Sequence, residues 1–251
     1  MDKLTTAVAA IAAIALIGTL AVAAEAAAQP AASAPVPGWT GCYVGGNLGV
    51  AWQRNNTVDV TSHPAFDTGG DTGTSLGGGG QAGCDYQFAG TGFTIGAQDM
   101  FDWASLSSGH RYGAVGSTER LGTQTHWFDT LTARVGYAVQ PQTLVYLKAG
   151  GAWAQVDYSD ADPASNPPYA GHAQKDRSGW TVGAGVEYAV RPNWSIVGEY
   201  DYIDLGNSNV PLSYNCGTAS QCGFPNPYTY RVSHRVQVAL IGVNYRFGWP
   251  R

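Results

Sequence analysis

The sequence contains few charged residues and very little lysine. Asp, Glu, Lys and Arg together make up 12% of its 251 residues, about half the share found in ordinary soluble proteins. The net charge is −5 and only three residues are lysine, so the chain lacks the basic surface that nucleic acid requires. Beyond the N-terminal region no apolar run is long enough for a membrane helix. Any later crossing of a bilayer must therefore use strands.

The N-terminus has the features of a secretory signal. An Ala-rich apolar run over residues 7–24 follows Lys3, and small residues at 26–28 offer a cleavage site before Gln29. We interpret 1–28 as a signal peptide, 29–38 as a Pro/Ala linker and 39–251 as one mature domain. An exported chain reaches an oxidising compartment, where its four cysteines can form disulfides.

Apolar and polar residues alternate along the mature chain. Near the C-terminus Val243, Tyr245 and Phe247 alternate with Asn244 and Arg246, which places the two sets on opposite faces of a strand. Similar segments, many with aromatic ends, occupy residues 39–52, 78–88, 93–103, 127–137, 144–153, 180–188 and 194–202. Strands of about 9–11 residues with aromatic ends suit a bilayer and its interfaces. The pattern over 39–251 predicts an all-β fold, namely an eight-stranded antiparallel up-and-down transmembrane β-barrel.

The connections between these strands alternate in length. Short turns follow the second, fourth and sixth strands, whereas polar stretches of roughly 20 residues or more follow the others. Bacterial outer-membrane barrels have this asymmetry, with short periplasmic turns. We therefore expect the outer membrane of a Gram-negative bacterium, with periplasmic termini. The expected aromatic girdles are Trp52, Trp103, Trp127, Trp153, Trp180 and Tyr202 at the loop end, and Trp39, Phe88, Phe93, Tyr137, Tyr188, Trp194 and Phe247 at the turn end.

Charged residues of both signs share the inward face of these strands. They are Asp85, Asp102, Arg134, Lys148, Glu187, Glu199, Asp201 and Arg246. Eight strands leave an interior just wide enough for side chains to fill, and an unpaired buried charge carries a high desolvation cost. The expected pairs join Arg134 and Lys148 to Glu187, Glu199 or Asp201. We expect this network to plug the lumen, and a narrow water-filled pore is the alternative.

Two places interrupt the alternation. Asp99 falls on the lipid face of its strand and Met100 inside. In the last strand Val236, Val238 and Leu240 are out of phase with Ile241, Val243 and Tyr245. A β-bulge near Leu240 would bring both sets to one face.

Two disulfides are expected. Cys216 and Cys222 lie in a polar stretch whose backbone freedom allows a small ring in the fourth outer loop. Four aromatic residues near the ring form either a recognition surface or ordinary loop packing: Tyr214, Phe224, Tyr228 and Tyr230. Cys42 and Cys84 have outward parity on successive strands and similar heights above the turn-end girdle. They are therefore expected to oppose each other and bond; the alternative is a register slip of two residues, which would leave two separate thiols facing lipid.

Several segments resemble a known family. The segments are 39–47, 80–83, 127–128, 134–137, 179–188 and 244–247, and they are similar to the small outer-membrane β-barrel proteins of alphaproteobacteria. That family resembles the eight-stranded OmpA-like membrane domain and includes surface antigens of Brucella and Bartonella. The resemblance implies a surface-exposed structural barrel that contacts outer-membrane lipid, lipopolysaccharide and the barrel-insertion machinery. This chain departs from the family in the four residues that follow Phe247, and at Cys42 and Cys84, where the family tends to carry aromatic residues.

The sequence offers little for catalysis, for a metal or for a cofactor. His126 beside Asp129 is the only constellation that suggests catalysis. No nucleophile accompanies it, and strand parity places His126 on the inward face. Asp157, Asp160 and Asp162 lack the Gly and Glu of a calcium loop. We expect a monomeric, non-enzymatic barrel with a structural and surface-antigen role and no cofactor. A small porin and a surface-binding barrel of the adhesin or haemin-binding kind are the alternatives.

Overall fold

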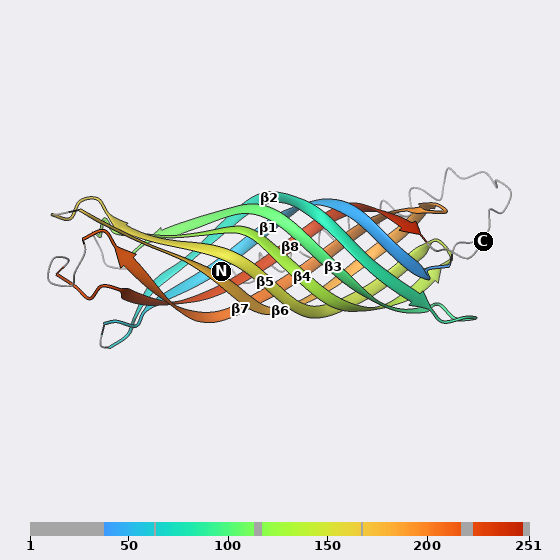
Figure 1. Ribbon diagram of the computed structural model, residues 1–251, viewed down its shortest axis with the longest axis horizontal. Helices are drawn as coiled ribbons and strands as arrows, with labels where there is room; N and C mark the ends of the chain where they lie inside the picture. Colours follow the sequence, from blue (N-terminus) through green and yellow to red (C-terminus); the bar gives the residue numbers. More distant parts are fainter. Residues whose placement is uncertain (1–37, 63, 113–116, 167, 217–222, 248–251) are drawn as a thin grey trace, which may run out of the picture. The chain divides into compact units, whose positions relative to one another are not determined.

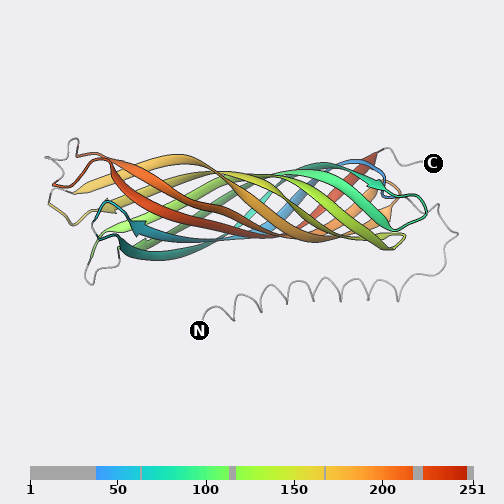
Figure 2. The ribbon, with the colours of Figure 1, turned by 90° about the horizontal axis from the view of Figure 1, so that it is seen from below.

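A computed structural model of the protein describes residues 38–62, 64–112, 117–166, 168–216 and 223–247. Eight antiparallel strands follow one another around a closed barrel, and the last strand pairs with the first (Figures 1 and 2). They are β1 (Gly41–Asp59), β2 (Phe66–Gln87), β3 (Phe93–Arg111), β4 (Arg120–Gln140), β5 (Thr143–Asp162), β6 (Tyr169–Arg191), β7 (Trp194–Tyr214) and β8 (Tyr228–Phe247). The predicted fold class is confirmed.

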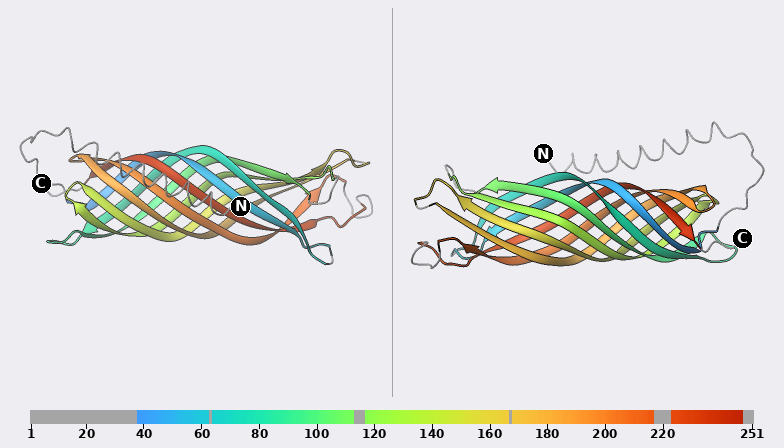
Figure 3. Two further views of the ribbon diagram at one scale, coloured as in Figure 1. Left: turned by 180° about the vertical axis from the view of Figure 1, so that it is seen from behind. Right: turned by 45° about the horizontal axis from the view of Figure 1, so that its top comes forward.

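Short turns lie at one end of the barrel, the turn end, and longer connections at the other, the loop end (Figure 3). The stretches expected to be long outer loops are largely strand. β5 continues beyond Trp153 to Asp162, for example, and β6 begins at Tyr169. The predicted strands were therefore too short at the loop end. Alternating burial continues there, but the outward residues are polar and resemble a loop in the sequence.

The outer face between the two ends carries an apolar band. Its exposed members include Val44, Leu48, Ile95, Leu131, Val135, Leu147, Val182, Ile196, Ile241 and Val243. Exposed Trp52, Trp103, Trp153 and Trp180 border it toward the loop end, and Phe88, Phe93, Tyr137, Tyr188, Trp194 and Phe247 toward the turn end. Such a band between aromatic girdles suits a bilayer.

Trp39 does not belong to the turn-end girdle, contrary to the prediction. Its side chain is buried, with 1% of the residue exposed. The guanidinium of Arg246 lies 5.3 Å from its ring centre, close enough for a cation–π contact. Because Trp39 precedes the first residue of β1, strand parity does not determine where it points.

The predicted bulge near Leu240 is also wrong. β8 pairs with β1 in continuous register through this region, with Leu240 opposite Gly49 and Ile241 opposite Leu48. Val236, Val238 and Leu240 are buried inside the barrel, whereas Ile241 is exposed outside. The two apolar sets lie on opposite faces because the lumen itself is apolar at this height. Met100 is likewise fully buried.

Candidate functional site in the barrel lumen

Two arginines and two carboxylates form a closed network near the turn end, the lower network. Arg134 Nε lies 3.2 Å from Asp85 Oδ1, and Arg134 Nη2 lies 3.2 Å from Glu187 Oε2. Arg246 Nη1 lies 2.9 Å from Asp85 Oδ2, and Arg246 Nη2 lies 3.2 Å from Glu187 Oε1. Each carboxylate thus contacts both guanidiniums. Two positive charges balance two negative ones, as burial of charge requires.

Tyrosine rings pack against the lower network. The guanidinium carbon of Arg134 lies 3.8 Å from the ring centre of Tyr146 and 5.4 Å from that of Tyr43. Glycines leave room for these rings: a Cβ at Gly185 would lie 2.3 Å from the Tyr146 ring, and one at Gly83 would lie 2.4 Å from the Tyr43 hydroxyl. The inward glycines therefore allow aromatic side chains to surround the buried charge.

Lys148 forms a second cluster with two carboxylates of β7. Its Nζ donates to Glu199 and lies 3.1 Å from Asp201 Oδ2. Glu199 also accepts a hydrogen bond from the hydroxyl of Tyr146, which links this cluster to the lower network. When both carboxylates are ionised, their charge exceeds that of Lys148 by one.

Asp102 stands apart from these clusters. Of the eight predicted lumen charges it alone makes no ion pair among the described residues. It lines a cavity of about 10 Å³ together with Asn47 and Phe128, which is room for about one water molecule.

Apolar side chains fill the lumen on both sides of the charges. Toward the loop end the filling includes Met100, Phe128, Val236, Val238 and Leu240. Toward the turn end it includes Trp39, Leu144 and Val197. The sequence reasoning missed both layers, although strand parity indicated that Met100 points inward.

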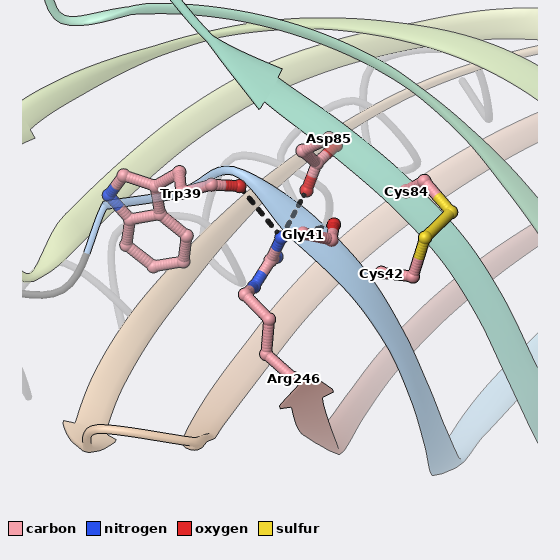
Figure 4. Close-up of a disulfide and its surroundings, with 6 residues drawn as sticks. All are labelled: Trp39, Gly41, Cys42, Cys84, Asp85 and Arg246. Carbon is pink, nitrogen blue, oxygen red and sulfur yellow. Dashed lines mark hydrogen bonds and ion pairs between the residues drawn. A yellow bond between two sulfur atoms is a disulfide. The ribbon is translucent and has the colours of Figure 1, made fainter. Parts of the chain in front are cut away.

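The structure contains the expected bond between Cys42 and Cys84. These residues are direct partners in the β1–β2 pairing, with their Cα atoms 3.9 Å apart. Figure 4 shows the disulfide beside Arg246, whose Nη1 donates to the carbonyl of Trp39 at 2.9 Å. The expected Cys216–Cys222 ring lies outside the described residues, because Cys222 is not among them.

The two residue groups considered for catalysis and cation binding do not assemble. His126 lies at a register shift in β4, and its Nε2 lies 2.8 Å from Asp157 Oδ2, not beside Asp129. A bulged residue escapes strict parity, so the expectation that His126 faces inward is wrong; its side chain is 37% exposed. Asp157 is half-buried, while Asp160 is buried at the loop end. The carboxylates of Asp157 and Asp160 therefore do not converge on one ion.

The aromatic residues expected in the fourth loop lie mainly at strand ends. Tyr214 ends β7, Tyr228 and Tyr230 begin β8, and Phe224 lies between them. Their rings pack together, with Tyr214 and Phe224 at 5.0 Å and Phe224 and Tyr228 at 6.0 Å between ring centres. They form part of a cavity at the loop end of the barrel.

Comparisons with known proteins agree with this architecture. A family model described as outer membrane protein beta-barrel domain matches residues 12–247. The 31 kDa outer-membrane immunogenic protein of Brucella melitensis biotype 1 is 32% identical over 238 residues, which cover 88% of this chain and 90% of the relative. The 25 kDa outer-membrane immunogenic protein of Brucella abortus biovar 1 is 30% identical over 221 residues, which cover 87% and 84%.

Two solved structures share the fold at low sequence identity. The outer membrane protein OprG from Pseudomonas aeruginosa gives a TM-score of 0.55 at 15% identity, covering 84% of this chain and 98% of that one. The outer membrane protease OmpT from Escherichia coli gives a TM-score of 0.51 at 9% identity, covering 88% and 100%. These identities indicate a common barrel architecture and nothing more specific.

Proposed function

The chain belongs to the outer-membrane β-barrel protein family, and from that premise we propose that it is a closed, non-enzymatic barrel that displays its loop end on the cell surface. The family locates it in the outer membrane of a Gram-negative bacterium, in contact with lipid and lipopolysaccharide. In this proposal it acts as a structural surface protein, with its termini in the periplasm.

The layered filling of the lumen carries the proposal. An ion that crosses the barrel must pass the Trp39 layer, then the charge clusters, then the layer around Met100 and Phe128. Trp39, Met100 and Phe128 are each at most 2% exposed. The arginines and carboxylates of the lower network bind each other and are not available to coordinate a passing ion. Such a filled interior is expected for eight strands.

The arrangement of the loop-end polar residues supports a role without catalysis. Ser108 Oγ donates to Asp71 Oδ1 at 2.7 Å, and His110 Nδ1 lies 3.1 Å from Asp71 Oδ2. In a hydrolytic triad the serine would donate to the histidine instead. The relatives named above are immunogenic outer-membrane proteins, and strands that project beyond the membrane are suitable surface for recognition by antibodies.

Planar-bilayer recording tests whether the barrel is closed. We expect the purified protein to add no discrete conductance steps to a bilayer in which a general porin, added next, opens normally. Regular steps from the folded protein would refute the proposal.

Epitope labelling tests the orientation of the barrel. A tag inserted between Pro64 and Ala65, in the β1–β2 connection, should be labelled on intact cells. The matched control is a tag between Pro141 and Gln142, in the β4–β5 turn, which should be labelled only after the outer membrane is permeabilised. The reverse result would contradict the orientation.

A further inference from the structure

A cavity of about 230 Å³ lies at the loop end of the barrel, apart from the charged network of the lumen. Aromatic side chains and two carboxylic acids line it, among them Glu119, Asp160, Tyr169, Tyr214, Phe224 and Tyr230. Glu119 directly precedes β4 and Asp160 belongs to β5, while the aromatic residues come from β6, β7 and β8 and from the segment between the last two. Segments distant in sequence thus build one site.

The carboxylate of Asp160 is buried and incompletely satisfied. Only 1% of the residue is exposed. Its Oδ2 accepts hydrogen bonds from the hydroxyls of Tyr214 and Tyr230, the latter at 3.1 Å. Its Oδ1 is buried and accepts from no hydroxyl or amide, so the proton held on the Glu119 carboxyl is the only one that Asp160 shares with a neighbouring acid among the described residues. The Tyr230 hydroxyl also lies 3.3 Å from Glu119 Oε1. Because a tyrosine hydroxyl has one proton, it cannot donate a full hydrogen bond to both Asp160 and Glu119. A buried acceptor of this kind is costly to leave unpaired.

Negative charge in the cavity has no cationic partner among the described residues. None of the ion pairs found in the described ranges includes Glu119 or Asp160. Burial, and then the neighbouring charge of Asp160, raises the pKa of Glu119 to about 8. Burial and these same carboxylates raise the pKa of Tyr169, Tyr214 and Tyr230 above the usual range. The site therefore favours a ligand that brings positive charge.

The aromatic walls match the same kind of ligand. Tyr169 lies 5.6 Å from Tyr214 and 5.1 Å from Phe224 between ring centres, both edge to face. Aromatic ring faces carry partial negative charge and attract ammonium groups. Magnesium and calcium ions require six or more oxygen ligands, and no group of three potential metal-ligating acids or histidines occurs among the described residues.

We propose that this cavity binds a protonated primary amine on a short alkyl chain. The ammonium group donates hydrogen bonds to Asp160 Oδ1 and to Glu119, and the alkyl chain packs against the rings of Tyr169, Tyr214 and Phe224. A quaternary ammonium ion would satisfy the charge but not the unpaired oxygen, since it has no N–H donor. The inference concerns the loop end alone and does not depend on whether the lumen conducts ions.

Binding of the amine should depend on pH. An ammonium ion displaces the proton that Glu119 retains. The affinity for the amine should therefore increase about tenfold for each unit by which the pH rises toward 8, and stay constant above pH 8. The titratable groups that face Glu119 from the surrounding strands share this cluster: Asp59 of β1, Tyr112 at the end of β3, Asp160 and Asp162 of β5, Tyr169 of β6, Tyr214 of β7, and Tyr228 and Tyr230 of β8.

Calorimetric titration of the folded full-length mature protein in detergent micelles tests the proposal, with butylammonium as the probe. Tetramethylammonium, butanol and calcium serve as comparison ligands. Glu119→Gln and Asp160→Asn each remove one cavity carboxylate. Asp162→Asn is the matched control, because it removes the same charge from an acid that is bonded to Thr118 in the same region.

We expect butylammonium to bind and tetramethylammonium to bind at least tenfold more weakly. Glu119→Gln should weaken butylammonium binding tenfold or more and abolish its pH dependence, while Asp162→Asn changes affinity less than twofold. The β-sheet circular dichroism of each variant is compared with that of the wild type, which guards against loss of binding through failure to fold. No binding by folded wild-type protein, equal loss in Asp162→Asn, or displacement of the amine by equimolar calcium would each overturn the assignment.

Discussion

Replacing Arg134 with methionine should destabilise the barrel severely. Methionine preserves much of the side-chain volume and removes only the charge and its hydrogen bonds. In the wild type the guanidinium bridges Asp85 and Glu187 and donates to the Tyr43 hydroxyl. Without it, two buried carboxylates share the single cation Arg246. Removal of one partner from a buried pair costs about 3–5 kcal/mol, and the free energy of unfolding should fall by that amount.

Arg235→Met is the matched control. Arg235 Nε lies 3.2 Å from Asp204 Oδ2, the same separation as in the Arg134 pairs, but its side chain is 50% exposed, compared with 2% for Arg134. Exposed pairs contribute about 0–1 kcal/mol. Urea unfolding of both variants in lipid vesicles, followed by tryptophan fluorescence, measures the difference. If the two variants unfold within about 1 kcal/mol of each other, the lumen charges do not hold the barrel together and the reasoning fails.

A double-mutant cycle separates the pair from the general effect of substitution. Glu187→Gln alone leaves Arg134 with one carboxylate partner, and the combined Arg134→Met, Glu187→Gln variant restores the balance between Arg246 and Asp85. Contacting residues typically couple by about 0.5–3 kcal/mol. We expect the double variant to be more stable than the sum of the two single losses predicts. Strict additivity would show that the two residues do not interact.

Three further perturbations follow from the structure. Asp201→Asn should be tolerated within about 1 kcal/mol, because Lys148 keeps its hydrogen bond to Glu199. Glu199→Gln should cost about 3–5 kcal/mol in the same unfolding assay, because it removes the charged acceptor to which both Lys148 and Tyr146 donate. The double variant Cys42→Ser, Cys84→Ser should lose about 2–4 kcal/mol, since the bond closes a chain segment with a sequence separation of 42; dithiothreitol should lower wild-type stability to match and leave the variant unchanged. Because Glu119 has a folded pKa of about 8, above its unfolded value, its stabilising effect is fully present below the unfolded value and is lost as pH rises through 8. Backbone amides at the loop ends of β4 and β5 should then lose more protection from hydrogen exchange between pH 6 and 9 in the wild type than in Glu119→Gln.

Strand parity alone predicted much of the lumen. In the segments 180–188 of β6 and 194–202 of β7 the alternation runs unbroken, so the inward positions of Glu187, Glu199 and Asp201 followed directly from counting by two. The direct opposition of Cys42 and Cys84 followed from their similar heights above the turn end. Parity could not assign partners, however. The contact of Glu187 with two arginines depends on how β4, β6 and β8 face one another across the barrel, and a single sequence does not encode that distance explicitly.

The sequence-based predictions failed at residues whose surroundings differ from those of strand residues in the middle of the membrane. Beyond the loop-end tryptophans the outer face meets water, so outward positions become polar and the extended strands resembled loops. Trp39 lies outside the regular strand, where parity does not determine the direction of a side chain. The first error comes from judging the structure by the polarity of the outward face beyond the membrane, and the second from applying strand parity to a residue outside the strand.

The misinterpretation of β8 concerns the inside of the barrel. The bulge was inferred on the assumption that apolar residues must face lipid, so that Val236 and Val238 had to share a face with Ile241. The interior of an eight-stranded barrel is just wide enough for side chains to fill, so it is a protein core that accepts either paired charge or apolar groups. Here both occur in successive layers: Trp39, then the charge clusters, then Met100 and Val238. The out-of-phase residues of β8 are therefore the sequence signature of the apolar layer that fills the lumen toward the loop end.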